Sequence, residues 1–565
     1  MITLFINPMP ACRHYYSIPG FIMLILWGYF VFALVIYIPN MGGGGLRLPQ
    51  NILCWVAMQL IILMGGFYAL SHKQLKWNLP LLAFTAGAAL MMVPFLWSGQ
   101  EAFLYALPRF AGLWGGILFY LALLQIPLQP SHKKQLVILL IVSAGLQSLL
   151  ACWQLRVITP DNLMEFMPGM RPYGIFQQTN VLASFIATGF ACVVWLLFKV
   201  KSWRGAITLL MLSAVFAGLL DLLQSRAGIV GMLVYTLFIC IVRYRPRLRG
   251  VFTAWIAVVA VTLSVIHLLK FYGLGGQFLQ LLGTVNKEGT NTERVIILKA
   301  TYQMILEHPL SGWGYGSYEF NLPRVALDHF HHIFGQNIDH AHNEVLFEWA
   351  EGGMFAVVGM MCIAAGYLSL FRRYAPCKKA LWGLAIPIAF HLMVEYPLLL
   401  SVPHWMTLLL ICRLTTPERM ASVNDRRSGA GWLLPVTALM GLLFMVTGLQ
   451  TGTTLTQFER GKMQDFTAAS RVVNPWIQWD RWQYDKHTAL LMRYNQTRNI
   501  ALLEEYARWA IVYLQHKNDF RVYLGLAQIN RMLPETSRSQ WLKDAWNTYY
   551  RGAAGIEQQD KRLLQ

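Results

Sequence analysis

Long apolar runs alternate with short polar links along most of the chain. A helix that crosses the hydrocarbon core of a bilayer needs about 20 mostly apolar residues, and about thirteen runs approach or reach that length. They cover residues 19–38, 50–70, 79–97, 102–126, 134–152, 181–200, 204–223, 227–242, 250–269, 344–371, 380–398, 402–414 and 431–450. The pattern predicts an all-α polytopic membrane protein in which the run 402–414 is the shortest span.

The links between the runs carry their positive charge unevenly. Lys and Arg accumulate in the cytoplasmic loops of membrane proteins. With the N-terminus inside, the inward links hold Lys73 and Lys76, Lys133 and Lys134, Lys199 to Arg204, Arg243 to Arg249, Arg372 to Lys379, and Arg413 to Arg427. The short outward links hold only Arg47, Arg156, Arg171 and Arg226. This bias sets the topology and leaves the outward links on the non-cytoplasmic side.

Two longer polar segments then also lie outside, the loop 270–343 and the tail 451–565. We therefore expect a transmembrane domain of residues 1–450, which includes the loop, and a C-terminal domain of residues 451–565. Within the tail, Asn499–Leu514 and Ser537–Tyr550 have the apolar spacing of helices. A small helical domain is predicted, without a repeat of fixed period.

Composition supports the membrane class. Apolar residues make up 56% and charged residues 13% of the chain, whereas a soluble domain carries about 25% charged residues. The net charge of +19 lies in the links and forms no basic, aromatic-rich surface, so we expect no nucleic-acid partner. The first run is a full-length span without a cleavage site, which argues against a signal peptide. Almost all of the eight cysteines fall in spans or inward links, which disfavours disulfides and thiolate metal sites.

The loop 270–343 carries a helix-start signal. Thr290 is followed three residues later by Glu293, the pattern of a capping box. A helix from about 291 to 307 would place Arg294 in its first turn. Free backbone N–H groups and a guanidinium would then converge on one anion, although an exposed arginine without a partner fits the spacing equally well. Beyond it, Gly312, Gly314 and Gly316 indicate a tight turn with a close backbone approach.

Histidines and carboxylates gather where the loop meets the next span. The spacing of His329, His331, His332, His340 and His342 fits no standard zinc pattern, so a metal site is the minority interpretation and no cofactor is expected. After His342 and Asn343, the residues Glu344, Glu348 and Glu351 share one helix face. A carboxylate beside an imidazole can orient it for general-base chemistry, while simple capping of the span is the alternative.

Other polar residues lie near the outward ends of spans. The segment from Arg171 through Gln178 to Asn180 precedes the sixth run, where an ordinary turn is the alternative. Arg226 lies in the link between the seventh and eighth runs. The alternative to a functional role for Arg226 is an ion pair with Asp221. Arg109 lies within the fourth run and needs a partner in the helix bundle. His391, Glu395, Tyr396 and Pro397 end the eleventh run. Arginines without an acidic metal cluster suggest a polyanionic ligand such as pyrophosphate, and its place at this membrane face suggests a lipid.

Several short motifs together resemble the superfamily of bacterial O-antigen ligases and polymerases. The ligase motif is His-Asn, nine residues, then Gly, and His342-Asn343 is followed after nine residues by Gly353. Ala356 stands where that motif usually has Gly, Thr or Tyr. The segments Arg171–Asn180 and His391–Leu398 look like those of the protein O-oligosaccharyltransferases of the PglL type. The stretch Leu399–Ser401 after the second segment departs from that pattern.

The resemblance implies a glycosyltransferase of the bacterial inner membrane with its active site on the periplasmic face. The donor would be an oligosaccharide on undecaprenyl pyrophosphate, and the acceptor a Ser or Thr hydroxyl of a periplasmic or pilin-like protein. Arg171, Arg226 and Arg294 would stabilise the leaving pyrophosphate, and His342 would act as general base or position the acceptor. Gln178, Asn180, Asn343, Glu395 and Tyr396 would contact the substrates.

Two other functions stay open from the sequence. Within the superfamily, the chain could transfer O-antigen to lipid A–core or polymerise repeat units. In a different class, it could transport a polyanion. A transporter places ionisable groups near the bilayer midplane, whereas these residues cluster near one membrane face, which favours the enzyme.

Overall fold

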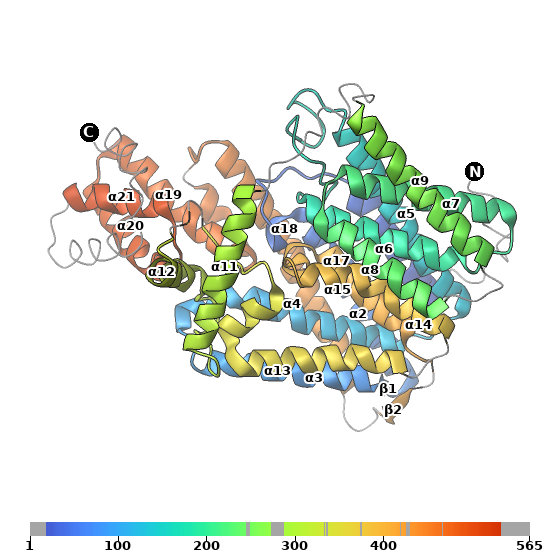
Figure 1. Cartoon of the computed structure of the whole chain (residues 1–565). Coiled ribbons are helices and arrows are strands. Elements are labelled where there is room, and N and C mark those ends of the chain that lie inside the picture. The colour runs from blue at the N-terminus through green and yellow to red at the C-terminus, as the bar shows by residue number, and fades with distance from the viewer. Residues whose placement is uncertain are drawn as a thin grey trace. The chain divides into compact units, whose positions relative to one another are not determined.

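The computed structural model describes residues 18–243, 249–272, 288–332, 334, 337–372, 376–418, 420–424, 430–465 and 467–532, and their regular secondary structure is almost entirely helical (Figure 1). The first helices are α1 (Ile18–Trp27), α2 (Pro49–His72), α3 (Leu79–Met92), α4 (Gln100–Gln125), α5 (Pro130–Gln154), α6 (Thr179–Leu197), α7 (Trp203–Leu222), α8 (Arg226–Arg243) and α9 (Arg249–Phe271). They are followed by α11 (Glu288–Glu307), α12 (Tyr318–Phe330), α13 (Glu344–Arg372), α14 (Pro376–Trp382), α15 (Ile386–Leu392), α16 (Pro397–Leu400), α17 (Val402–Thr415), α18 (Leu433–Arg460), α19 (Trp479–Thr497), α20 (Ile500–Tyr513) and α21 (Phe520–Met532).

Eleven helices of the described residues are long and apolar enough to cross a membrane. They correspond to eleven of the predicted runs, so the chain is an all-α polytopic membrane protein, as predicted. The count of thirteen is not confirmed. The run 380–398 is divided among α14, α15 and α16, and the run 402–414 forms α17 of only 14 residues.

Although α17 is short, its two ends contact links that the charge pattern assigns to opposite sides of the membrane. At its start, the side chain of Asn51 donates to the carbonyl of Leu400 at 2.8 Å and accepts from the N–H of Val402 at 3.0 Å. Near its end, Arg413 is fully buried and donates to both carboxylate oxygens of Glu418. The first end therefore lies with an outward link of the charge-based topology and the second with an inward one.

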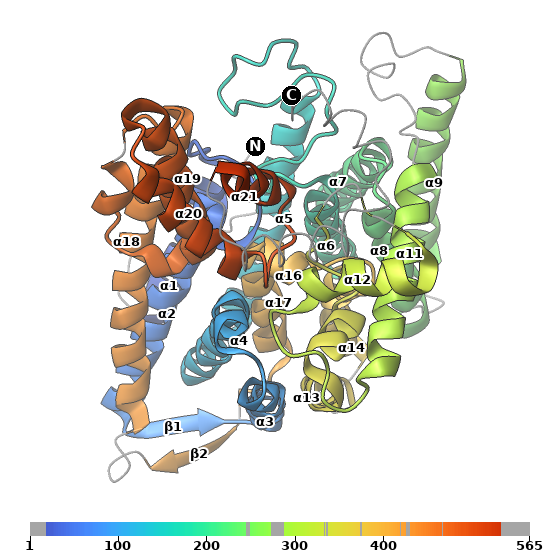
Figure 2. The same ribbon diagram turned by 90° about the vertical axis from the view of Figure 1, so that its left-hand side faces the viewer.

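The predicted inward links come together. Strand β1 (Gln74–Trp77) pairs antiparallel with strand β2 (Ala421–Asn424), which Figure 2 shows below α18. Lys133 forms an ion pair with Glu418 at 2.8 Å, and the backbone N–H of Lys76 donates to Gln125 at 2.8 Å. The sequence analysis did not anticipate the strands, but their pairing joins two links that the charge pattern assigns to one side.

Two compact units make up the chain. The first comprises residues 1–85, 112–285 and 362–452, and the second comprises residues 86–111, 286–361 and 453–565. Within the first unit, α6 is the central helix, since nearly all its residues are buried. In contrast, α9 buries only Phe252 and Trp255.

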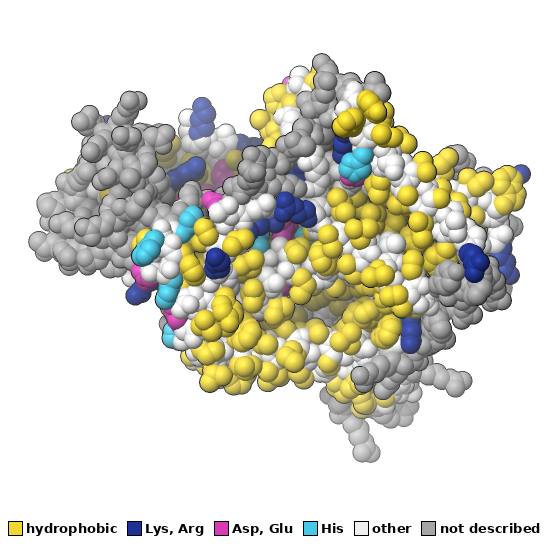
Figure 3. All heavy atoms as spheres, viewed as in Figure 1, with side chains coloured by type: hydrophobic (Ala, Val, Ile, Leu, Met, Phe, Trp, Pro, Cys, Tyr) yellow, Lys and Arg dark blue, Asp and Glu magenta, His cyan; other side chains and the backbone are white. Residues whose placement is uncertain are grey.

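Apolar side chains cover the surfaces of several spans. Figure 3 shows hydrophobic side chains gathered over α13 and over α9. On α13 the exposed residues include Phe355 and Met361, and on α9 they include Val261 and Leu268. A large exposed apolar surface is what contact with lipid acyl chains requires.

The long outer loop and the tail both contain helices of the second unit. In the loop, α11 and α12 pack around a core that includes Ile297, Tyr318 and Leu322. In the tail, α20 begins after Asn499, whose side chain accepts from the N–H of Ala501. The predicted helix 499–514 is therefore confirmed. The predicted helix Ser537–Tyr550 and residues 273–287 of the loop lie outside the described residues.

Candidate active site

In the second unit, the glycine-rich turn of the loop lies directly against α13. Gly312, Gly314 and Gly316 all have positive φ, at 68°, 92° and 79°. The N–H of Gly314 donates to the carbonyl of Glu351 at 2.9 Å, and the N–H of Met354 donates to that of Leu310 at 3.0 Å. The tight turn and close backbone approach expected from the sequence are thus confirmed.

This contact explains the glycine of the ligase motif. Gly353 has a non-helical φ of 60° inside α13, and a Cβ added there would lie 2.2 Å from the carbonyl oxygen of Leu310. A Cβ added at Gly312 would lie 2.2 Å from the carbonyl oxygen of Glu351. Only residues without side chains allow the two backbones to approach so closely.

Arg109 forms ion pairs within the helix bundle, as its position inside a predicted span requires. Its Nη2 lies 2.6 Å from Oε2 of Glu351, and its Nε lies 3.2 Å from Oε1 of Glu348. The other oxygen of Glu351 accepts from the backbone N–H groups of Gly316 and Tyr318 at 2.9 and 3.1 Å. The buried ion cluster therefore ties α4, α13 and the glycine turn together.

Two histidines precede α13, and the structure distinguishes them. Nδ1 of His340 accepts from the backbone N–H of His342 at 3.0 Å, which requires the proton on Nε2, and this nitrogen lies 3.2 Å from Oε2 of Glu344. Both ring nitrogens of buried His340 are therefore engaged. His342 is half-buried and adopts a left-handed φ of 54°. That conformation is uncommon for a residue with a side chain and is often found at functional sites.

Asn343 begins the span. Its Oδ1 accepts from the N–H of Leu346 at 3.0 Å, the bond of a helix N-cap. Capping of the span, the alternative for this region, therefore holds for the side-chain carbonyl of Asn343.

Arg294 does not occupy the predicted position in its helix. Helix α11 begins at Glu288, so Thr290 is inside the helix and the predicted capping box at Thr290 is wrong. Arg294 then lies in the second turn, beyond the free N–H groups of the first turn. The helix over 291–307 is otherwise confirmed, but a helix N-terminus no longer contributes to an anion site at this arginine.

The loop histidines are dispersed among different contacts. His329 lies 2.9 Å from Glu307, and the ring of His332 packs on Phe334. Among the residues that the structure describes, no group of three His, Cys, Asp or Glu side chains is placed to hold a metal ion.

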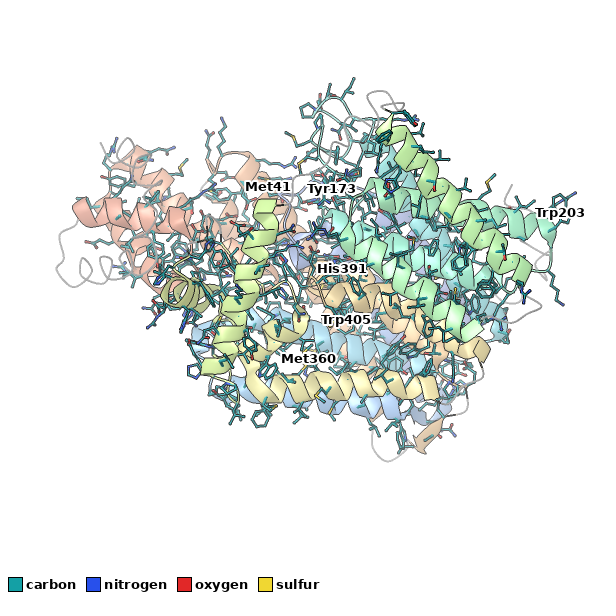
Figure 4. All side chains as sticks on the ribbon, viewed as in Figure 1. Met41, Tyr173, Trp203, Met360, His391 and Trp405 are labelled. Carbon is teal, nitrogen blue, oxygen red and sulfur yellow. The ribbon has the colours of Figure 1, made fainter. Side chains whose placement is uncertain are left out.

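In the first unit, the two segments of the protein-glycosylating pattern meet. Nδ2 of Asn180 donates to Oε1 of Glu395 at 2.6 Å, and Oδ1 of Asn180 accepts from Ser225 at 2.8 Å. The other carboxylate oxygen of Glu395 lies 3.0 Å from Nε2 of His391, which Figure 4 labels on the helical ribbon. Glu395 is only 2% exposed. These residues therefore form a buried network at the N-terminal ends of α6 and α8 and the C-terminal end of α15.

The arginines of this unit flank the link between α7 and α8. Nη1 of Arg171 lies 3.3 Å from the carbonyl of Leu223, and Arg226 is the exposed first residue of α8. Asp221, the alternative partner considered for Arg226, lies instead 2.7 Å from Lys270 and 3.5 Å from His267. A guanidinium at the N-terminus of an 18-residue helix provides the positive potential that an anion requires.

The remaining predicted contacts of this unit are partly accessible. Gln178 is half-buried and precedes α6, and its Oε1 is a buried atom without a hydrogen-bond partner. Tyr396 is half-buried and follows Glu395 directly.

Several members of the network were missed from the sequence. Ser184 of α6 bonds to His391, and His404 of α17 bonds to Ser184. Ser225 and Ser401 complete the two ends. A single hydroxyl in an apolar span does not change the periodic pattern of the sequence. The one usable sign was His404, because a histidine within the apolar run 402–414 is costly to bury unless it has a partner.

Multiple apolar spans with polar clusters at helix ends define a polytopic membrane protein with candidate sites beside the bilayer. Comparison with family models identifies it further. The model described as "O-Antigen ligase" matches residues 212–361, "Protein glycosylation ligase" matches residues 172–197, and "Virulence factor membrane-bound polymerase, C-terminal" matches residues 379–564. No curated protein matches the chain. Separate parts of the chain are thus similar to O-antigen ligases and to protein glycosylation ligases. The chain is a glycosyltransferase-type enzyme for ligase-type glycan transfer.

Proposed function

We propose that this enzyme transfers an oligosaccharide en bloc from undecaprenyl pyrophosphate to Ser or Thr hydroxyls of periplasmic or pilin-like proteins. The acceptor oxygen forms a bond to the anomeric carbon, the bond from that carbon to the pyrophosphate breaks, and the hydroxyl proton leaves. In this proposal, the enzyme lies in the bacterial inner membrane with its outward links in the periplasm. The positive-inside rule supports that orientation.

The main support is the match of residues 172–197 to the protein glycosylation ligase model. These residues include Gln178 and Asn180, and Asn180 is bonded to Glu395 of the second segment that resembles protein-glycosylating enzymes. A sequence likeness between two distant segments and a direct bond between them are consistent with one functional unit.

We assign the donor pyrophosphate to the arginines. Arg171 and Arg226 flank one link of the first unit, and the N-terminus of α8 adds its partial positive charge there. Pyrophosphate leaves readily when its developing charge is stabilised by fixed positive groups. Arg294 keeps its proposed role in the same chemistry through its guanidinium alone, without a helix N-terminus behind it.

We assign the acceptor hydroxyl to His342. His342 is the first residue of the His-Asn motif, it is half-buried, and it adopts a left-handed backbone conformation, which supports a role in accepting a proton or orienting a hydroxyl. Gln178, Asn343 and Tyr396 are proposed as contacts to the glycan or acceptor. Asn180 and Glu395 are proposed to hold such contacts in place, since their polar atoms bond to one another.

A second candidate function is polymerisation of glycan repeat units. It is favoured by the match of residues 379–564 to the polymerase C-terminal model. In that reaction the acceptor hydroxyl belongs to another lipid-linked glycan. Transfer to lipid A–core is the third outcome within the superfamily.

The test expresses the chain in a glycan-producing host that lacks its own ligase. We expect periplasmic or pilin-like proteins to gain the mass of one complete glycan at Ser or Thr. Glycan found only on lipid A–core, or longer glycans on the lipid carrier, would contradict the protein acceptor. His342→Ala should abolish the transfer, whereas His329→Ala, which removes an exposed histidine paired with Glu307, should leave it intact.

A further inference from the structure

The network behind Asn180 and Glu395 continues into the helix bundle. Nδ1 of His391 lies 2.8 Å from Oγ of Ser184, and the same hydroxyl lies 3.0 Å from Nε2 of His404. Nδ1 of His404 lies 2.8 Å from Oγ of Ser401. His391, Ser184 and His404 are fully buried, and Ser401 is nearly so. Six hydrogen bonds therefore join Ser225 to Ser401 in one continuous series.

The hydrogen bonds along this series depend on one another. If Glu395 accepts at both oxygens, Nε2 of His391 must carry a proton and its Nδ1 must accept from Ser184. Ser184 has only one proton, so its oxygen then accepts from Nε2–H of His404. Nδ1 of His404 is left to accept from Ser401. Every donor in this arrangement points toward Glu395, and both histidines carry their proton on Nε2.

A competing arrangement exists at Ser184. Its hydroxyl also lies 3.1 Å from the carbonyl of Val181 and can donate there. Both histidines would then donate to Ser184, so His391 would carry its proton on Nδ1 and His404 on Nε2. That arrangement would leave Nε2 of His391 without a proton and require Glu395 to donate to it.

We propose that Ser184, His391 and His404 form a unidirectional hydrogen-bond relay that couples the charge of Glu395 to His404 in the middle of the bundle. Fully satisfied polar networks in a low-dielectric interior polarise one another and fix a single arrangement of the surrounding helices. The walls of the relay are apolar, since the rings of Phe176 and Phe185 pack against His404.

The relay gives these residues a positioning function in the enzyme. Ser225 directly precedes Arg226, and Glu395 directly precedes Tyr396. The bonds of the Ser225 and Glu395 side chains therefore fix the backbone to which Arg226 and Tyr396 are joined. In the glycan transfer proposed above, on which this step rests, the relay fixes the place of a pyrophosphate-binding arginine and of a substrate-contacting tyrosine. His391, Ser184 and His404 do not themselves touch the substrates.

The test measures the ring-nitrogen signals of the full-length protein in lipid bilayers by solid-state NMR with ¹⁵N-labelled histidine. His391→Gln and His404→Gln identify the two residues by the loss of their signals. We expect both histidines in the neutral form with the proton on Nε2. Any other pair of states, including protons on different nitrogens or a charged ring, would overturn the proposal.

The coupling is tested with Glu395→Gln, which removes the charge with little change of shape. We expect the His404 signals to shift in this variant and to be insensitive to Glu395→Gln once Ser184→Ala is also present. Unchanged His404 signals in Glu395→Gln alone would overturn the relay. Because the direction of the bonds is read from the assigned wild-type signals, that part of the test stands even if Glu395→Gln or Ser184→Ala fails to fold.

A separate measurement tests the positioning function. Ser184→Ala removes the bonds of this hydroxyl to His391 and His404. Each buried hydrogen bond is worth about 1 kcal/mol, so the variant should lower the transfer rate about thirtyfold with unchanged membrane insertion. Normal transfer by Ser184→Ala would remove the positioning function but leave the NMR result intact. A wild-type enzyme without transfer activity would instead contradict the proposed function alone.

Discussion

Nδ2 of Asn180 donates to Oε1 of Glu395 at 2.6 Å, although 215 residues separate them in the sequence. One residue lies in the part of the chain that matches a protein glycosylation ligase and the other in the part that matches a membrane-bound polymerase. Both belong to the first compact unit. The bond shows that two motifs with separate family likenesses share one polar network.

Exchange of these two side chains provides the first prediction. Asn180→Asp would place two carboxylates against each other and should lower transfer at least tenfold, since like charges at this distance repel strongly. The double variant Asn180→Asp with Glu395→Gln lets the new amide donate to the new carboxylate and still accept from His391. We expect it to recover most of the activity in a glycan-transfer assay. Equal loss in the single and double variants would show that the pair does not act as a unit.

The motif glycine provides the second prediction. Gly353→Ala should prevent the turn at Leu310 from docking on α13, because the new methyl group would lie 2.2 Å from a carbonyl oxygen. We expect strongly reduced thermal stability in detergent and no transfer. Gly145→Ala on α5 is the matched control, since nothing lies within 4 Å of its added Cβ. A Gly353→Ala protein as stable as Gly145→Ala would contradict the close backbone contact.

A third prediction concerns how the tail holds the loop. Nζ of Lys517 lies 2.6 Å from Oε2 of Glu319 on α12 and 5.0 Å from the ring centre of Tyr105. Burial raises the pKa of Glu319, and Lys517 opposes this only in part. Burial would lower the pKa of Lys517, but the attraction of Glu319 and Asp480 outweighs it and raises that pKa. The cost of burying this pair is therefore offset by its mutual attraction and, for Lys517, also by Asp480.

Removal of one member should accordingly cost more than removal of both. We expect Lys517→Met to destabilise the protein by about 2 kcal/mol, between the values for exposed and fully buried pairs. The double variant Lys517→Met with Glu319→Gln should be closer to wild type. Thermal unfolding of the four proteins gives the coupling energy, and strictly additive losses would show that no interaction joins the tail to α12.

The donor arginines give a fourth prediction. Lys lacks the planar fork with which Arg holds two phosphate oxygens. Arg226→Lys should therefore lower the rate of donor consumption while the folded stability stays unchanged, because Arg226 is exposed. Arg47→Lys, a conservative change at another outward arginine, serves as the control. Wild-type donor kinetics in Arg226→Lys would remove this residue from pyrophosphate binding.

Much of the fold could be predicted because its determinants are local. Apolar runs set the eleven long spans, and the charge of the links grouped Lys76, Lys133 and Arg413 on one side, where β1, β2 and Glu418 now join their links. The two short helical segments failed the same criterion, since α15 has 7 residues and α17 has 14.

The site was predictable in its residue types but not in its pairings. The need of Arg109 for a partner followed from its depth in a span, yet only the folded chain identifies Glu348 and Glu351. Thr290 failed as a cap because α11 starts one turn earlier than the local pattern indicates. Ser184 and His404 escaped notice because they bond to each other from two different helices, beyond the reach of any spacing rule.

The most direct measurement uses the purified enzyme in lipid vesicles with an undecaprenyl-pyrophosphate oligosaccharide and a pilin-like protein acceptor. We expect the intact acceptor to gain one whole glycan while undecaprenyl pyrophosphate is released in equal amount, and we expect neither product from His342→Ala. Release of undecaprenyl pyrophosphate with the glycan attached only to lipid A–core or to a second lipid-linked glycan would contradict the protein acceptor. The absence of any transfer by the wild-type protein, with all three acceptors supplied, would contradict the proposed substrates altogether.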